Sequence, residues 1–500
     1  MHRHGTRLAL ALAAAMAVVL VAGGPRLGTA ATTPGTATNF TLVGHNSLFD
    51  RGMNAAPALF DHYIYIGSRT DGIPQHGVHT GVQIVDIANP ANPTVVGQIP
   101  IPTELTAGYT SRELRVWPQQ KVLMVIYFGC SALIHACASG QDTGEQPLQR
   151  INFFDVSGSH GAAPVLTSTY TPSTTPHEMF LWVDPHNPAR ALMYFTSPNN
   201  NKKQLVVTDI SGWRTGTFNE LTTFSVVPDY TPAQQSSFDV RLHSLSISVD
   251  GTRGYLAYLG GGVLVIDTSQ VAAGVANPTI SPITPVAGRA FWDYEGAHSS
   301  VKIPGKPYIL TTEEIYGKGT PALGALFGPA FGGCPWGWVR IVDMHDPTHL
   351  KVVSQFRIDE NQPSFCASVS TTADNFSSYT SHNPTVLPDI AFVTWHSGGL
   401  RAIDLTNPVH PVQDGFFVPT PDTLPPGDVH TADPVLEPGS NGTIAWSYPI
   451  IHNGLIYYVD IANGLYVVKY TGRHAREVSS IGFLEGNSNL GAAARLAGGA

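Results

Sequence analysis

Seven copies of one short pattern constrain this chain more than any other feature of its sequence. Each copy is an apolar, β-branched segment that ends in Asp and one further apolar or small residue. The copies occupy residues 82–87, 151–156, 205–210, 263–268, 339–344, 400–405 and, with Lys469 in place of the Asp, 465–470. Successive copies start 54 to 76 residues apart, and self-similarity at such periods is typical of repeat architectures.

The sequence around each copy repeats as well. A second apolar strand precedes it, as at 254–259, and another strand comes before that one, as at 245–249. An Asn-Pro or Asp-Pro turn and a fourth strand, such as 352–358, often follow. Four strands joined by tight turns form a meander that cannot bury both faces alone. We therefore predict an all-β, seven-bladed β-propeller over residues 40–486, with an open solenoid as the alternative. The Asp of each copy is expected to accept hydrogen bonds from the turn that follows it.

Composition agrees with many short strands and turns. Charged residues make up only 13% of the chain, whereas Gly numbers 50 and Pro 39. The net charge of −9 provides no basic surface for nucleic acid or anionic lipid. No P-loop, dinucleotide fingerprint, G-x-S-x-G elbow or H-E-x-x-H motif is present.

The first thirty residues read as a secretory signal. Arg3 and Arg7 precede the apolar stretch 8–22, and small residues lead to a cleavage site near Ala30. The apolar stretch is too short for a comfortable membrane span, and no later segment approaches one. The mature protein is expected to be secreted, whether extracellular, periplasmic or cell-wall-associated. The expected organisation is a signal peptide at 1–30, a flexible linker at 31–39, the propeller at 40–486 and a disordered tail at 487–500.

Export changes how the four cysteines are interpreted, because an even number of cysteines in an oxidising compartment usually means disulfides. Cys130 and Cys137 lie in one loop excursion, and Cys334 and Cys366 flank the outer half of one repeat. We predict the disulfides Cys130–Cys137 and Cys334–Cys366. Thiolate metal ligands would need closer pairs such as C-x-x-C, which are absent.

Histidine recurs at one position of the repeat, about seven residues before the turn that ends the first strand. In a propeller the first strand of each blade lines the central channel, so these positions are expected to meet at one mouth of it. The residues at this position, in chain order, are Met53, Arg112, His177, His243, His298, His382 and Trp446.

Four adjacent imidazoles without cysteine favour a copper or non-haem iron ion over structural zinc, although zinc remains open. We predict that His177, His243, His298 and His382 bind one ion. The alternative is that each histidine only bonds the backbone of a neighbouring blade. Arg112 and Glu113 are expected to form a channel salt bridge. Further candidates for the ring N–H groups or the channel wall are Glu178, Glu295, Glu313, Glu314 and His396.

The Ile-Val-Asp strand followed by Asn-Pro resembles the LVIVD-repeat family of bacterial β-propellers. The matching segments are 83–90, 340–343 and 401–408. This resemblance implies the propeller architecture over roughly residues 40 to 485 and no shared reaction. The histidine register is similar in outline to propeller metalloenzymes with His on the axis, namely carotenoid cleavage oxygenases, nitrous oxide reductase and the selenium-binding/methanethiol oxidase proteins. Segment 392–399 is similar to a segment of the last group.

Two functions follow from the sequence. The first is a secreted metalloprotein, with oxidoreduction of a small molecule at the channel mouth as its expected activity. The second is a non-catalytic propeller that binds an extracellular protein or glycan through its top-face loops.

Overall fold

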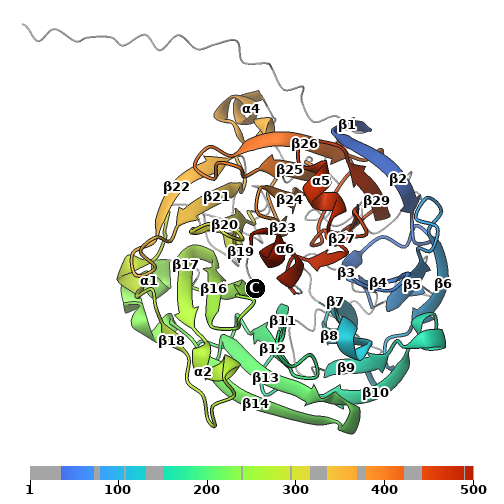
Figure 1. Cartoon of the computed structure of the whole chain (residues 1–500), viewed down its shortest axis with the longest axis horizontal. Coiled ribbons are helices and arrows are strands. Elements are labelled where there is room, and N and C mark those ends of the chain that lie inside the picture. Colours follow the sequence, from blue (N-terminus) through green and yellow to red (C-terminus); the bar gives the residue numbers. More distant parts are fainter. Residues whose placement is uncertain are drawn as a thin grey trace, which may run out of the picture. The chain divides into compact units, whose positions relative to one another are not determined.

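The Asp-ending segments each form one strand of an antiparallel meander in the structure, a computed structural model. It describes residues 35–71, 79–105, 108–130, 150–237, 240–292, 296–315, 335–368, 379–421, 442–488 and 490–498. Residues 32–500 form one compact unit. The sheets of this unit are arranged around a common centre, as Figure 1 shows. The all-β propeller class is therefore confirmed.

The described strands form six hydrogen-bonded sheets. One sheet contains two consecutive meanders joined by the single pair Ser68–Ser111. Its strands are β3 (Asn54–Phe60), β4 (Tyr63–Ser68), β5 (Val82–Asp86), β6 (Thr94–Ile99), β7 (Tyr109–Trp117), β8 (Val122–Gly129), β9 (Arg150–Asp155) and β10 (Val165–Tyr170).

Three further sheets have four strands each, in chain order from the inside outwards. They are β11 (Met179–Val183), β12 (Ala191–Thr196), β13 (Leu205–Gly212) and β14 (Thr217–Phe224), then β15 (Leu242–Ile247), β16 (Arg253–Tyr258), β17 (Gly262–Asp267) and β18 (Ser281–Pro282), then β19 (Ala297–Lys302), β20 (Tyr308–Glu313), β21 (Val339–Asp343) and β22 (Lys351–Phe356).

The last two sheets have five strands each because they recruit segments from the ends of the chain. One runs through β23 (Pro384–Val386), β24 (Ile390–Thr394), β25 (Leu400–Asp404), β26 (Val412–Val418) and β1 (Thr36–Thr38). The other runs through β30 (Phe483–Glu485), β27 (Ile450–His452), β28 (Leu455–Asp460), β29 (Gly464–Tyr470) and β2 (Phe40–Asn46).

The burial of the strands follows from their place in the meander. The third strands are covered on both faces by neighbouring sheets, so successive residues are buried whichever way they point, as in β5 and β17. The outer strands β6 and β22 alternate between exposed and partly buried residues, because one face meets solvent. The repeat therefore encodes the layer in which each strand lies.

The Asp that closes each copy organises the next turn, as predicted. In all six copies that carry the Asp, its Oδ1 accepts a hydrogen bond from the backbone N–H two residues later, at 2.8–2.9 Å. Such Asx turns help to reverse the chain towards the fourth strand. The residues concerned are Asp86, Asp155, Asp209, Asp267, Asp343 and Asp404.

The predictions for both ends of the chain are wrong in part. The linker prediction for 31–39 overlooked β1, whose Thr36–Thr38 pairs with Val418 to Phe416 of β26. Composition alone does not reveal that β26 leaves an edge for Thr residues to extend. The predicted disordered tail contains α6 (Gly491–Leu496), whose Ala493 is fully buried in the core. A short Ala-rich helix suits this place because its small side chains pack closely.

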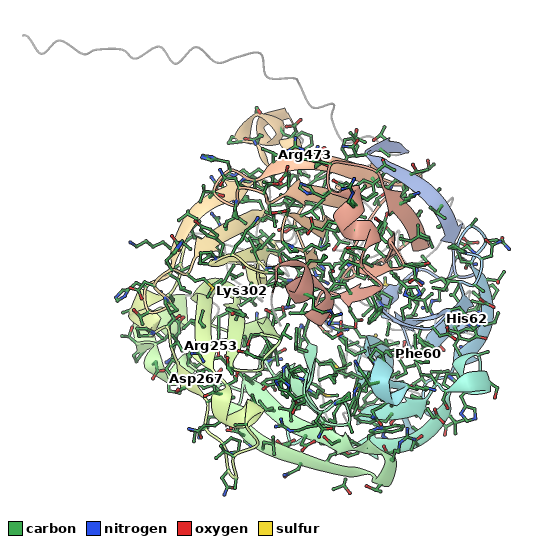
Figure 2. All side chains as sticks on the ribbon, viewed as in Figure 1. Phe60, His62, Arg253, Asp267, Lys302 and Arg473 are labelled. Carbon is green, nitrogen blue, oxygen red and sulfur yellow. The ribbon has the colours of Figure 1, made fainter. Side chains whose placement is uncertain are left out.

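The helices are short and lie between strands or at the C-terminus. None within the described segments is long and apolar enough to cross a membrane. On the outside of the unit, the cross-strand neighbours Arg253 and Asp267 form an ion pair of 3.4 Å and are labelled together in Figure 2. The α-helices are α1 (Pro232–Ser237), α2 (Ser269–Ala272), α4 (Pro363–Ser368), α5 (Ala475–Ser479) and α6. The 3-10 helices are Thr103–Leu105, Pro118–Gln120, Gly158–Gly161, Trp213–Thr215, Val227–Asp229, Leu259–Gly261, Val286–Gly288 and Asp359–Asn361.

Candidate metal centre

Irregularities in the innermost strands direct the predicted site residues towards one another. The pairing register of β15 with β16 skips His243, and that of β19 with β20 skips His298. The register of β7 with β8 skips Arg112 in the same way. A β-bulge leaves one residue outside the ladder and re-aims its side chain, which is why bulges are frequent at functional sites.

Two further histidines take the equivalent place just before their strands. The backbone N–H of His177 donates to the carbonyl of Thr196, and that of His382 donates to the carbonyl of Thr394, both at 2.8 Å. These bonds continue the ladders of β11 and β23 by one step. The four histidines therefore occupy the same position in four successive meanders.

At each site position after His177, the backbone carbonyl accepts a hydrogen bond from a hydroxyl group of the preceding meander. Such bonds tie the position of one histidine to the neighbouring sheet. They run from Thr196 Oγ1 to the His243 carbonyl at 2.8 Å, from Ser244 Oγ to the His298 carbonyl at 2.8 Å, from Thr312 Oγ1 to the His382 carbonyl, and from Thr394 Oγ1 to the Trp446 carbonyl at 3.1 Å.

The structure brings the four predicted histidines together in a continuous row, called the histidine cluster below. Ring centroids are 4.6 Å apart for His177 and His243, 4.0 Å for His243 and His298, and 4.2 Å for His298 and His382. The Nε2 atoms of His177 and His243 lie 3.0 Å apart. His177 is the partly exposed member, whereas the other three are buried.

The carboxylate of Glu314, directly after β20, faces this cluster. Its oxygens lie 3.0 Å from His382 Nε2, 3.5 Å from His298 Nε2 and 3.9 Å from His243 Nε2. One ligand atom each from His298, Glu314 and His382 lie within 4.8 Å of one another. We predicted that Glu314 would accept hydrogen bonds from the ring N–H groups of the histidines. In the structure its carboxylate lies instead beside their Nε2 atoms.

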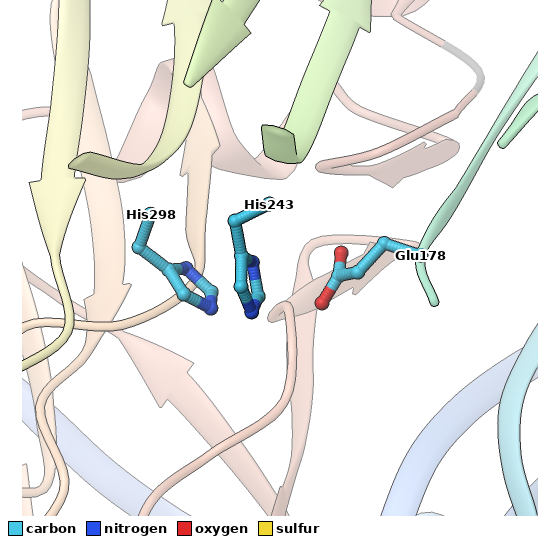
Figure 3. A group of neighbouring side chains, drawn as sticks. All are labelled: Glu178, His243 and His298. Atoms are coloured by element: carbon cyan, nitrogen blue, oxygen red, sulfur yellow. The ribbon is translucent and has the colours of Figure 1, made fainter. Parts of the chain in front are cut away.

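Glu178, the neighbour of His177, also approaches the cluster. It forms a second compact group with His243 and His298, and Figure 3 shows its carboxylate directed towards His243. Burial, followed by the charge of Glu113, raises the pKa of Glu178 to about 8. Glu178 therefore adds little negative charge at neutral pH.

Burial favours the neutral form of the three buried imidazoles. Burial lowers the pKa of His243, His298 and His382 well below the usual value, because desolvation disfavours the charged ring. A neutral imidazole presents a nitrogen lone pair, which is the form that binds metal ions.

The hydrogen-bond partners of His382 fix its tautomer. Its Nδ1 lies 2.6 Å from the carbonyl oxygen of Trp446. Because a carbonyl only accepts, Nδ1 carries the hydrogen and the lone pair of the neutral ring is on Nε2. That lone pair points at a carboxylate oxygen of Glu314 only 3.0 Å away. Two acceptors at this distance require a proton or a cation between them.

The predicted salt bridge between Arg112 and Glu113 is wrong. Glu113 pairs with Arg115 at 3.1 Å, whereas Arg112 Nη2 lies 3.1 Å from His177 Nε2. Because the bulge takes Arg112 out of the ladder and re-aims its side chain, these neighbours have different partners. The Arg112 guanidinium also lies over the Phe128 ring, 4.8 Å from its centroid.

Glu313 does not join the cluster either. One of its oxygens accepts a bond from the Trp338 N–H at 3.0 Å, and the other is 3.1 Å from Arg340 Nη2. Glu313 and Arg340 thus form a buried ion pair, and only the next residue, Glu314, faces the cluster. Glu295 lies outside the described residues.

His396, predicted to line the channel, lies beside the cluster. Its ring stacks on Trp446 with centroids 4.6 Å apart, and it is 5.2 Å from the His382 ring. The guanidinium of Arg69 covers Trp446 at 4.3 Å. Sequence reasoning missed Arg69, and no repeated pattern marks it. It also missed the recurring threonines at the ends of second strands (Thr196, Thr312 and Thr394), which the alignment of the repeats does reveal.

The disulfide pairings stay predictions. Cys130 takes part in a disulfide, but Cys137 and Cys334 lie outside the described residues. Cys366 lies in α4.

No protein-family model matches this chain. No curated protein matches it either, so the LVIVD-repeat resemblance stays a prediction. Solved structures with a similar fold include Chaetomium thermophilum Sqt1 bound to the N-terminus of the ribosomal protein L10, at 13% identity and a TM-score of 0.43, covering 87% of this chain and 91% of that chain. Another is the β-propeller domain of Myceliophteria thermophila Cps50 (Swd1), at 9% identity and a TM-score of 0.44, covering 83% and 96%. Because these values are low, the fold assignment rests on the sheet topology itself.

Proposed function

We propose that the histidine cluster and Glu314 bind one transition-metal ion. The observation that carries the proposal is the contact between the Nε2 lone pair of His382 and the Glu314 carboxylate at 3.0 Å. A proton would satisfy that pair of atoms alone. A metal ion would also engage the neutral imidazoles of His298 and His243, which lie next to the same carboxylate.

The distances suit a common ion. Ligands at about 2.1 Å and at right angles are separated by roughly 3.0 Å. That value matches His382 Nε2 to Glu314 and His177 Nε2 to His243 Nε2. We assign His298, His382 and Glu314 as the best-formed ligand set and His243 as the next. His177 can become a ligand only if the Arg112 guanidinium moves away from the Nε2 atom of His177.

Copper and iron are the favoured ions, with zinc as the alternative, because imidazole and carboxylate ligands without thiolate suit them. Three protein ligands leave coordination positions open for a small molecule. Oxidoreduction of a small molecule is the activity that we propose for such a centre.

Metal retention tests the proposal. Purified full-length protein is loaded separately with copper, iron and zinc, dialysed, and analysed for metal content. We expect wild type to retain an ion and His382→Ala and Glu314→Gln to lose it. His349→Ala is the matched control, because the ring of this exposed histidine bonds, among the described residues, only with Asp346 and Thr348 of its own turn. The proposal fails if wild type retains no metal, or if correctly folded His382→Ala retains as much as wild type.

Three further expectations belong with this proposal. We count the two meanders of the eight-stranded sheet as separate blades, which gives seven blades in all. Export to the outside of the cytoplasm stays a proposal, because residues 1–34 lie outside the described residues. Binding of an extracellular protein or glycan is the alternative function, and a metal-free wild type would favour it.

A further inference from the structure

Arg112 is a buried cation that the proposed metal centre does not use. Its side chain is only 8% exposed and occupies the bulge position of β7. Its Nη2 contacts His177 Nε2, and its Nε has no hydrogen-bond partner among the residues that the structure describes. Buried charges normally pair with an opposite charge, and an unpaired one marks a place for a ligand.

The carboxylates near Arg112 have other partners or positions. Glu113 pairs with Arg115, and Glu314 faces His298 and His382. Glu178, on β11's N-terminal side, forms its compact group with His243 and His298. Within the described segments, no carboxylate forms an ion pair with Arg112.

A second cation borders the cluster at its other end. Arg69 is 1% exposed and covers Trp446, whose ring lies 4.2 Å from His382 and 4.6 Å from His396. Arg112 and Arg69 therefore flank the row of histidines at its two ends. A bound metal ion between them adds further positive charge.

We propose that this site binds small anions, such as the carboxylate of a small organic acid, with Arg112 as the charged hydrogen-bond donor. The inference rests on the proposed metal ion for the second positive charge. The anion reaches the site beside His177, the only partly exposed member of the histidine cluster. There it takes up the Nε–H donor of Arg112, while the contact with Phe128 holds the guanidinium plane. Guanidinium groups bind carboxylates through paired donors, which gives direction as well as charge.

The isosteric pair acetate and acetamide tests this inference, because the two probes differ in charge and hardly in shape. Each is titrated into copper-loaded full-length protein while the visible absorption of the ion is followed. We expect wild type to bind acetate at least about tenfold more tightly than acetamide. Arg112→Met should weaken acetate binding about tenfold and leave acetamide unchanged. Arg112→Lys keeps the charge and should retain part of the preference.

The exposed Arg214→Met serves as the matched control and should behave as wild type. Equal binding of acetate and acetamide by metal-loaded wild type overturns the inference and leaves the metal proposal standing. Unchanged acetate binding in folded Arg112→Met also overturns it. If wild type retains no metal, the proposed function fails. The same pair is then compared by the shift in melting temperature of the metal-free protein, and a preference for acetate that depends on Arg112 would still support the anion site.

Discussion

Thr196 connects two neighbouring sheets at the centre of the site, so its hydroxyl should be needed for both stability and metal binding. The side chain is fully buried at the end of β12. Its Oγ1 donates to the His243 carbonyl at 2.8 Å and accepts from the Glu178 N–H at 3.1 Å. Thr196→Val replaces the hydroxyl with a methyl group of similar size, so packing is preserved and both bonds are lost.

The expected cost follows from the two backbone groups left behind. Each buried group without a partner costs about 1–3 kcal/mol. The free energy of unfolding should therefore fall by about 2–6 kcal/mol in Thr196→Val. Because the lost bond holds the carbonyl of His243, metal retention should weaken as well. Thr196→Ser retains the hydroxyl and should recover most of both losses.

Urea unfolding followed by circular dichroism measures the first effect, and metal analysis after dialysis measures the second. Thr223→Val provides the matched control, because Thr223 is exposed on the outer strand β14 and β-branched residues are equivalent there. A decrease of less than about 0.5 kcal/mol in Thr196→Val, no larger than that of the control, would refute the claim that this hydroxyl fixes the site.

Two further predictions concern the scaffold. Gly44→Ala should destabilise the protein by about 3 kcal/mol, because the new Cβ would lie 2.1 Å from the Pro90 carbonyl oxygen; Gly482→Ala, where the Cβ meets open space, should be neutral in the same denaturation assay. Hydrogen bonds from the Ser269 side chain and backbone lower the pKa of Asp267. This contribution is present above the unfolded pKa of about 3.9 and is lost as pH falls through the folded value, so the loss of stability in Asp267→Asn should be largest near pH 7 and should shrink as the solution is acidified below the unfolded value.

The repeat predicted the position of the site residues because it determines which strand is innermost. Arg112, His177, His243, His298 and His382 all lie where the alignment of strands and turns placed them. That prediction needed only the spacing between a residue and the next turn. It did not require knowledge of how the sheets are oriented relative to one another.

The sequence could not show which of two neighbouring carboxylates faces the histidine cluster, and the reason is geometric. Glu313 and Glu314 are consecutive, and consecutive side chains leave a strand on opposite sides. One binds Arg340 and the other faces His382. The ladder of β20 ends at Glu313, and the bulge at His298 shifts the pairing by one residue. A pattern of polar and apolar letters does not determine such a shift.

The pairing of β2 with β29 has a consequence for how fast the protein folds. Phe40 pairs with Tyr470, so the contact that closes the ring joins residues separated by almost the whole chain. Contacts between such distant residues form slowly, because a long loop has to be closed before any bond is gained. Until Tyr470 is available, the remaining sheets form an arc with unpaired edges at both ends, and such edges are prone to aggregation. Ring closure should therefore be the late, rate-limiting step of folding.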